Sequence, residues 1–191
     1  MSRRKFFADV ALTAGLALIP PATGLQANGE TQQPMIVLKP GEFYFRVDGK
    51  PSFLLGRNPT GWQVEQFEPL LKWAAESGER IVRIHLTNGI APSAPAGEVD
   101  ESWALKWDRV FDMAAQNALC VLPVLGLWSD WNDGSKGEPW HRWDKNPFNA
   151  ALGGPARQPV ELLRNTPCRK VWLQWLRKLV ARWQGRPNIV G

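Results

Sequence analysis

Apolar residues recur at the helical period along the last part of the chain. From Arg164 onward they fall at i, i+3, i+4, i+7, i+8 and i+11, which places them on one stripe of a helix. Gly185 is expected to close this helix in the left-handed conformation, and Pro187 prevents it from resuming. Residues 188–191 then have the composition of an opening strand. The residues of the stripe are Trp172, Trp175, Leu176, Leu179, Val180 and Trp183.

Two earlier segments show the same period. In residues 65–77 the apolar positions predict a helix that Gly78 ends. In residues 100–117 Asp100 is a good N-cap, because its side chain can accept a hydrogen bond from the free backbone N–H groups of a first turn. The inner stripe of the first helix is Phe67, Leu70, Leu71, Ala74 and Ala75, and that of the second is Trp103, Trp107, Val110, Phe111 and Ala114.

Alternating or continuous apolar runs predict the strands. Residues 43–47 and 52–56 flank Asp48-Gly49, which is typical of a hairpin. Residues 80–86 and 119–127 are short apolar runs, and the second is apolar enough to be covered on both faces. The resulting order is hairpin, β, α, β, α, β, loop, α, β, which predicts an α/β fold with a parallel sheet.

This order fits both an open doubly wound sheet and an eight-stranded barrel. Residues 56–61 lack the glycine fingerprint of a dinucleotide-binding turn. The long loops follow the strands, which favours a (β/α)8 TIM barrel with its site at the carboxyl ends of the strands. The chain would supply an N-terminal hairpin, about three βα units and the start of a fourth strand.

The segment 128–158 has no period. A loop of this length inside a domain is uncommon and is usually functional. The chain has 11 Trp and one Tyr, and Trp128 and Trp131 are candidate platforms for stacking on sugar rings. Packing within the loop explains them nearly as well, and Trp140 and Trp143 are weaker candidates of the same kind.

The first residues have the pattern of an export signal. Arg3-Arg4 precede a moderately apolar run and then two prolines, as in twin-arginine signals. The run is too short to span a bilayer, which takes about 20 apolar residues. We expect residues 1–27 to be a removed signal peptide, 28–41 a linker and 42–191 the domain, exported to the periplasm or the extracellular space. The alternative is a chance basic start on a disordered tail.

Charge and cysteine usage exclude several classes of function. The signal accounts for three of the 23 basic residues and one of the 18 acidic residues, and the remaining charges are scattered. Nothing therefore favours a nucleic-acid partner, and no membrane partner is expected after signal removal. Cys120 and Cys168 are expected to be buried or free thiols. His85 and His141 lie outside any metal-ligand spacing, so no metal or cofactor is expected.

Four short runs, in order, carry a resemblance to a known family. Asp48-Gly49-Lys50-Pro51 leading to Gly56-Arg57-Asn58, and Ile81-Val82-Arg83-Ile84, resemble segments of retaining glycoside hydrolases of the (β/α)8 clan that includes family 5. Residues 146–149 with 153–155, and residues 181–184 with 187–190, look like a loop and a helix-turn of cellulase and mannanase relatives. The resemblance covers most of residues 43–191.

The resemblance implies a set of substrate-binding residues. Arg83 matches an arginine near the nucleophile of the family, and alternation puts His85 on the same face of the strand. Both would lie at the floor of the site; the alternative is a snorkelling arginine beside a solvated histidine. Asn58 would face the ligand or merely end a strand before Pro59. Together with Trp128 and Trp131, these are the substrate-binding candidates.

The resemblance also implies where the catalytic carboxylates belong. Retaining hydrolysis uses two carboxyls about 5 Å apart, and the family pattern places the acid/base glutamate a few residues beyond Gly191 and the nucleophile much later. No catalytic residue is therefore assigned within these 191 residues, and the chain alone is expected to be inactive. A different carboxylate pair in the long loop is disfavoured, because loop carboxylates are usually solvated. Its acids are Asp130, Asp133, Glu138 and Asp144.

The function expected is therefore that of a polysaccharide-degrading glycosidase acting on O-glycosyl bonds, of cellulase or mannanase type. The partner is a polysaccharide or oligosaccharide. The alternative is a non-catalytic carbohydrate-binding or decayed fragment, and a third is an α/β domain that binds another small molecule. Self-association through unpaired sheet edges is also expected.

Overall fold

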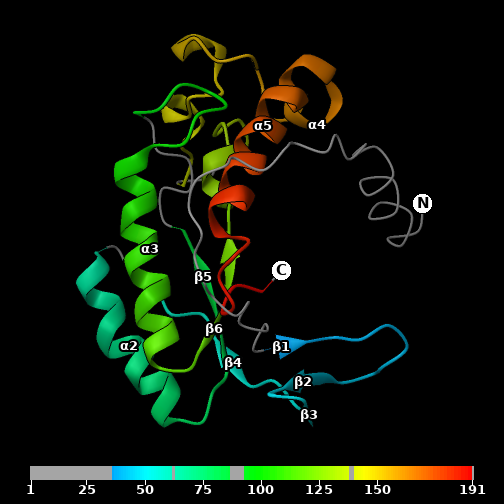
Figure 1. The fold of residues 1–191 in the computed structure, drawn as a ribbon. Helices are drawn as coiled ribbons and strands as arrows, with labels where there is room; N and C mark the ends of the chain where they lie inside the picture. The colour runs from blue at the N-terminus through cyan, green and yellow to red at the C-terminus, as the bar shows by residue number, and fades with distance from the viewer. Residues whose placement is uncertain (1–35, 62, 87–92, 138–139, 191) are drawn as a thin grey trace, which may run out of the picture. The chain divides into compact units, whose positions relative to one another are not determined.

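The computed structural model describes residues 36–61, 63–86, 93–137 and 140–190, which form two three-stranded sheets and their helices (Figure 1). The expected signal peptide, residues 1–27, lies outside the described residues, as does most of the expected linker. In the described ranges no helix is long and apolar enough to cross a membrane.

The first sheet is antiparallel, with strand order β1-β2-β3. Its strands are β1 (Ile36–Val37), β2 (Phe45–Val47) and β3 (Lys50–Ser52). The expected hairpin is present: Asp48 and Gly49 both have positive φ, 49° and 77°, as a tight two-residue turn requires. β1 falls within the segment expected to be a linker, because a strand of two residues has no period of its own and is defined by its partner β2.

The second sheet is parallel, with strand order β4-β5-β6. Its strands are β4 (Gly56–Arg57), β5 (Ile81–His85) and β6 (Cys120–Val124). Ile189 forms a further parallel bridge with Val121, and Val121 N donates to Asn188 O at 2.7 Å. The residues predicted to open a strand therefore do pair with the sheet.

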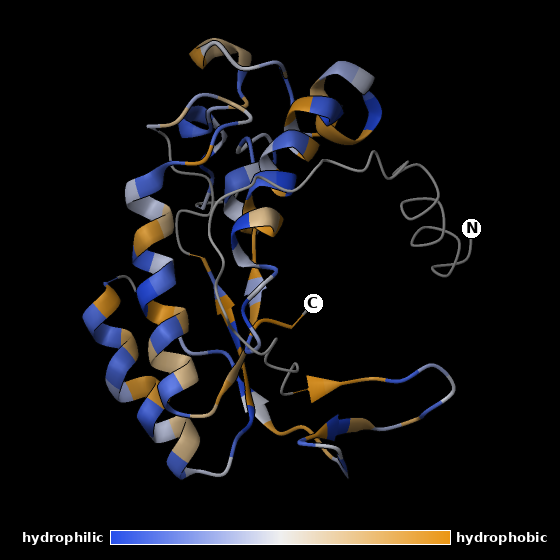
Figure 2. Ribbon diagram, in the orientation of Figure 1, coloured by the Kyte–Doolittle hydropathy of each residue, from blue (hydrophilic) through white to orange (hydrophobic). Residues whose placement is uncertain are grey.

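The helices α2 (Val64–Glu76), α3 (Glu101–Gln116) and α5 (Thr166–Trp183) share one hydrophobic core with this sheet. β5 contributes Val82 and Ile84 to the core and β6 contributes Val121. Figure 2 shows the hydrophobic colour along the parallel strands, and hydrophilic and hydrophobic colours in turn along α2 and α3. The α/β class predicted from the sequence is confirmed.

Both predicted ends of the earlier helices are confirmed. The Asp100 side chain accepts from Trp103 N at 2.9 Å, so it is the N-cap of α3. Gly78 follows α2 with φ of 78°, the left-handed conformation that glycine adopts without strain.

The last helix differs from its prediction in three respects. A separate short helix, α4 (Glu161–Arg164), precedes it, because the Asn165 side chain caps α5 by accepting from Cys168 N. Gly185 does not adopt positive φ; instead a tight turn follows, in which Arg186 N donates to Trp183 O at 3.0 Å. Val180 is exposed rather than part of the buried stripe.

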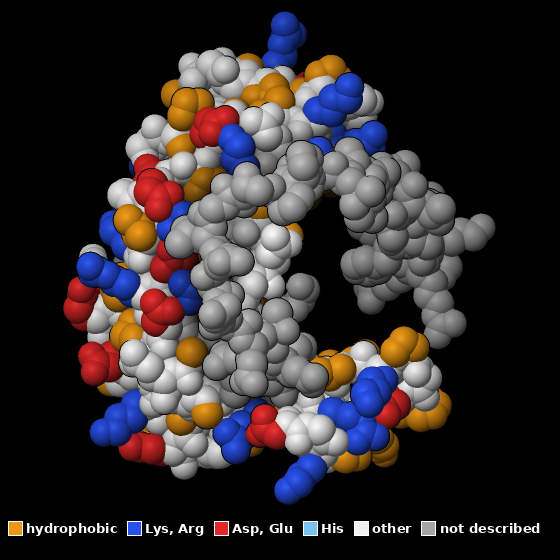
Figure 3. All heavy atoms as spheres, in the orientation of Figure 1, with side chains coloured by type: hydrophobic (Ala, Val, Ile, Leu, Met, Phe, Trp, Pro, Cys, Tyr) orange, Lys and Arg blue, Asp and Glu red, His pale blue; other side chains and the backbone are white. Residues whose placement is uncertain are grey.

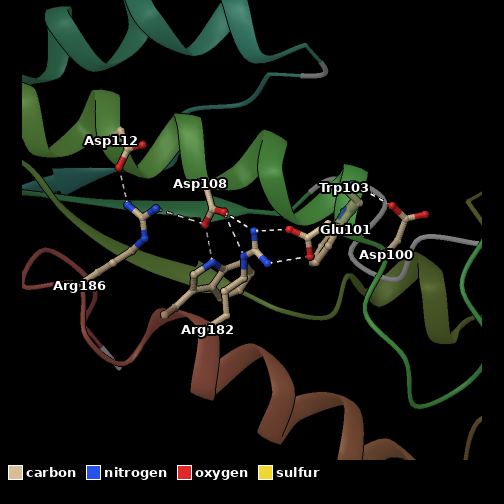
Figure 4. Close-up of polar contacts among 8 residues, drawn as sticks. Asp100, Glu101, Trp103, Asp108, Asp112, Arg182 and Arg186 are labelled. Carbon is tan, nitrogen blue, oxygen red and sulfur yellow. Dashed lines mark hydrogen bonds and ion pairs between the residues drawn. The ribbon is translucent and has the colours of Figure 1, made fainter. Parts of the chain in front are cut away.

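Charged side chains join α3 to the end of α5 (Figure 4). Asp108 accepts from Arg182 Nη2 at 2.5 Å and from the Trp183 indole N–H at 2.9 Å. Arg186 pairs with Asp108 and with Asp112. Elsewhere acidic and basic side chains alternate over α2 and α3 (Figure 3). The network fixes the turn that leads Ile189 to the sheet.

The long loop consists of short 3-10 helices rather than irregular chain alone. They are η1 (Trp128–Trp131), η2 (Trp143–Lys145) and η3 (Ala150–Leu152). Three residues separate the end of β6 from the start of η1, so η1 lies at the carboxyl end of a parallel strand, where sites of α/β proteins usually form.

Candidate functional site

Two substrate-binding candidates, Arg83 and His85, lie on one face of the parallel sheet. The opposite face packs against the hydrophobic core. Alternation along β5 sends Val82 and Ile84 to the core and Arg83 and His85 to the second face. Arg83 Nη1 lies 2.6 Å from His85 Nε2. The structure therefore brings these two residues into direct contact.

The pair is electrostatically matched. Burial, and next the Arg83 charge, lower the pKa of His85 below its usual value of 6.5. The ring is therefore neutral at pH 7, and a neutral Nε2 lone pair can accept from the guanidinium. This leaves other N–H groups of Arg83, which is exposed, available for a ligand hydroxyl or carboxylate.

The neighbouring strand makes the rest of this face apolar. In the parallel register Arg83 lies beside Leu122 and His85 beside Val124. Cys120, at the start of β6, is buried, and burial raises the pKa of its thiol to about 11. Its thiol is therefore protonated and is not a nucleophile at neutral pH.

Asn58 lies one residue beyond β4 and is exposed. The preceding residue, Arg57, points to the helix side: it pairs with Glu79 and lies over the Trp73 ring, 3.8 Å from the centroid. Asn58 thus lies at the carboxyl end of its strand, on a chain segment that Arg57 anchors to α2.

The second pair of candidates lines a concave surface beside η1, which we term the tryptophan groove. It has a volume of about 340 Å³. Trp128 is 58% exposed, whereas Trp131 is partly buried and packs edge-on against Trp172 with centroids 6.3 Å apart. The groove is lined by Trp128, Trp131, Asn132, Asp133, Ser135, Lys136, Gln158, Pro159 and Val160.

This lining mixes one exposed indole with hydrogen-bonding side chains, which is the chemistry that a sugar ring requires. Hydrogen bonds from Ser135, first from its side chain, lower the pKa of Asp133, so this carboxyl is ionised in the groove. Lys136 adds a cation beside it. The groove therefore offers acceptors, donors and a stacking surface.

The two weaker tryptophan candidates, Trp143 and Trp140, differ in burial. Trp143 is buried in the core, and its indole N–H donates to Arg157 O at 3.3 Å. Trp143 is therefore a core residue, in agreement with the alternative that it packs within the loop rather than binds sugar. Trp140 is exposed.

Asp130 contradicts the expectation that the loop carboxylates are solvated. It is 3% exposed, and burial raises the pKa of its carboxyl despite Arg142 and the Leu127 N–H, which lower it. Asn146, also buried, donates from Nδ2 to Asp130 O at 2.7 Å. No pattern in the sequence indicates this cluster, because Asp130 and Asn146 are 16 residues apart in a segment without a period.

Among the described residues, neither the thiols nor the carboxylates form a metal centre. Cys120 and Cys168 are both buried and free, as was expected. In the part of the chain that the structure describes, no group of three or more His, Cys, Asp or Glu side chains could hold a metal ion.

The fold has counterparts among solved structures. One, described as a glycoside hydrolase, is 14% identical with a TM-score of 0.52 and covers 82% of this chain. Another, a glycoside hydrolase family 5 protein from Bacteroides vulgatus ATCC 8482, is 15% identical with a TM-score of 0.52 and covers 84% of this chain. The chain spans about a third of the length of these structures, 33% and 34%.

No family model matches the sequence, and no curated protein matches it. At these identities the likeness concerns the fold alone. The chain has an α/β fold similar to that of these glycoside hydrolases.

Proposed function

We propose that this chain forms part of an exported (β/α)8-barrel glycoside hydrolase that acts on the O-glycosyl bonds of a polysaccharide. The expected type is a family 5-like cellulase or mannanase with a retaining mechanism. The partial barrel consists of the hairpin, the β4, β5 and β6 units and the bridge at Ile189. Two observations support the proposal: the parallel strands follow one another in consecutive order, and the fold is similar to that of two glycoside hydrolases.

The observation that carries the proposal is the chemistry at the carboxyl ends of the strands. β5 presents Arg83 and His85 on the second face of the sheet, and the segment after β6 presents the tryptophan groove. An arginine suits a carboxylate or sugar hydroxyls, and an exposed indole suits the apolar face of a pyranose. The combination is typical of a saccharide site.

The proposed roles are binding roles. Trp128 stacks on one sugar ring, and the partly buried Trp131 supports the wall of the groove beside Trp128. Arg83, kept beside a neutral His85, binds ligand oxygen or holds a neighbouring carboxylate ionised. Asn58 contributes a polar group from the end of β4. None of these residues is assigned the acid/base or nucleophile role, which retaining hydrolysis gives to two carboxyls about 5 Å apart.

The proposed localisation rests on residues 1–27, whose paired arginines and short apolar run suit a twin-arginine export signal. The proposed partner is a polysaccharide or oligosaccharide, and no cofactor has a role in the proposed chemistry. Self-association through open sheet edges belongs to the same proposal, because an unpaired strand edge offers free N–H and C=O groups.

Oligosaccharide binding tests this proposal. Isothermal titration of the chain with cellohexaose and with mannohexaose is expected to give binding to at least one of them. Trp128→Ala should weaken it about tenfold, equivalent to about 1.4 kcal/mol. Leu105→Ala is the control, because Leu105 is a large apolar side chain of comparable exposure, 51%, but lies on α3.

Two outcomes separate the alternatives. Equal losses in Trp128→Ala and Leu105→Ala, or no binding of either saccharide, contradict the proposal. Binding without turnover on cellulose and mannan is the expected result, and turnover by this chain would contradict the assignment of both catalytic carboxyls to positions outside it.

A further inference from the structure

A buried carboxylate lies directly behind the tryptophan groove. Asp130 belongs to η1, between the two tryptophans, yet its side chain turns inward and only 3% of the residue is exposed. It does not line the groove. Its neighbours on the inner side are Arg142, Lys145 and Asn146.

Asp130 is hydrogen-bonded to Leu127, the residue that precedes η1. Its backbone N–H donates to Leu127 O at 3.1 Å, and its Oδ2 accepts from Leu127 N at 3.2 Å. The first is a backbone bond of the 3-10 turn, and the second is the half of a capping box in which the side chain of the third residue accepts from the backbone N–H at the N-cap. The start of η1, and with it the backbone of Trp128, is thereby fixed relative to the end of β6.

Asp130 also ties η1 to the segment that begins η2. Its Oδ1 lies 3.9 Å from Arg142 Nε, and Arg142 N donates to Ser129 O at 2.9 Å. Asn146 Nδ2 donates to Asp130 O, while Asn146 Oδ1 accepts from Phe148 N at 3.0 Å. Phe148 in turn packs on Trp131, with centroids 6.1 Å apart.

Burying an ionised carboxylate to hold a loop costs desolvation free energy. Desolvation of a carboxylate costs free energy that one guanidinium at 3.9 Å does not fully offset. The raised pKa of Asp130 is the sign of that imbalance. An asparagine of the same shape would be cheaper to bury, so stability alone does not account for an aspartate here.

We propose that Asp130 is the positioning residue of the tryptophan groove, holding η1 in the conformation that presents Trp128 and Trp131 to a saccharide. The charged form accepts from Leu127 N and faces Arg142, with Lys145 lining the same recess. The attraction between the carboxylate and Arg142 holds η1 against the segment that begins η2. This inference rests on the proposed function only for the identity of the ligand.

The test uses Asp130→Asn, which keeps the shape and removes the charge. The chain is labelled with 5-fluorotryptophan, and the fluorine resonances of Trp128 and Trp131 are assigned with Trp128→Phe and Trp131→Phe. In the wild-type chain both resonances should shift with pH, with a midpoint above the usual aspartate value of about 3.9. In Asp130→Asn the shift should be absent. Asp144→Asn, on the same loop and exposed, should behave as wild type.

Stability and affinity give the second readout. Asp130→Asn should melt at the wild-type temperature or above it, because a neutral side chain replaces a buried charge, while its affinity for cellohexaose or mannohexaose at pH 7 falls at least fivefold. A large drop in melting temperature would make Asp130 a merely structural residue and overturn the proposal. So would fluorine shifts that persist in Asp130→Asn. If those shifts vanish but no saccharide binds the wild type, the positioning role stands and the proposed function fails.

Discussion

Arg83 Nη1 lies 2.6 Å from His85 Nε2, on the face of the parallel sheet that the helices do not share. Residues two apart on a strand point to the same side, so this contact follows directly from the sequence spacing. Its consequence is electrostatic. The arginine and the partial burial of the ring both favour a neutral histidine at the candidate site.

Removing the Arg83 charge should raise the pKa of His85. In Arg83→Met the Coulombic contribution of the guanidinium disappears, but burial, the larger cause, remains. The pKa should therefore rise and still stay below 6.5. Histidine ring resonances followed by NMR against pH measure it. Arg80→Met, one residue before β5, is the control and should leave the His85 titration unchanged. An unchanged pKa in Arg83→Met would show that the two side chains do not interact in solution.

The same lowered pKa gives a pH dependence of stability. Because the folded chain disfavours the charged ring, the contribution of His85 is fully present above the unfolded value of about 6.5 and is lost as the pH falls from there through the lowered folded pKa. His85→Gln should remove this component. Thermal melts of both chains between pH 5 and pH 8 measure it. Parallel pH profiles of the two chains would contradict the assignment.

Asp108 should be the most important carboxylate of the contact between α3 and α5. Burial acts to raise its pKa, but hydrogen bonds from Arg182 and Trp183 and the nearby arginine charges lower it overall. Asp108→Asn should therefore lower the free energy of unfolding by about 1–3 kcal/mol. The stability that Asp108 contributes is present above its unfolded pKa of about 3.9 and is lost as the pH falls through the lower folded value.

Asp112→Asn is the matched control for Asp108→Asn. Asp112 pairs with the same Arg186, but its side chain is 59% exposed against 17% for Asp108, and exposed ion pairs contribute little. In urea unfolding curves, the midpoint of Asp108→Asn should therefore be lower than that of Asp112→Asn. Equal midpoints would mean that burial of Asp108 adds nothing to the contact.

Both cysteines should be unreactive in the folded chain. Cys120 is fully buried with a thiol pKa of about 11, and burial also raises the pKa of Cys168. A thiol-reactive chromogenic disulfide should label neither in buffer and both in concentrated guanidinium chloride without reductant. Labelling that requires prior reduction would reveal a bridge between them.

The helices and the order of the strands could be predicted from the sequence because they are periodic. The stripe from Trp103 to Ala114 is buried as expected, and Asp100 caps its helix. The contact of Arg83 with His85 was implied by alternation alone. These features depend on neighbours within a few positions of the chain.

The missed features depend on partners far away in the chain. β1 exists only through its pairing with β2, and Asp130 is buried only because Asn146 and Arg142 fold back over it. The end of α5 was mispredicted for a related reason. Pro187 and the contacts of Arg186 with α3 stop the helix without a left-handed glycine.

Hydrogen exchange in the presence of saccharide tests the location of the proposed site most directly. With saturating cellohexaose or mannohexaose, amides of β5 and of η1 should exchange more slowly than in the free chain, while α2 and the β2–β3 hairpin should be unchanged. Protection confined to α2 or to the hairpin, or no protection at a concentration where titration shows binding, would contradict a saccharide site at Arg83, His85 and the tryptophan groove.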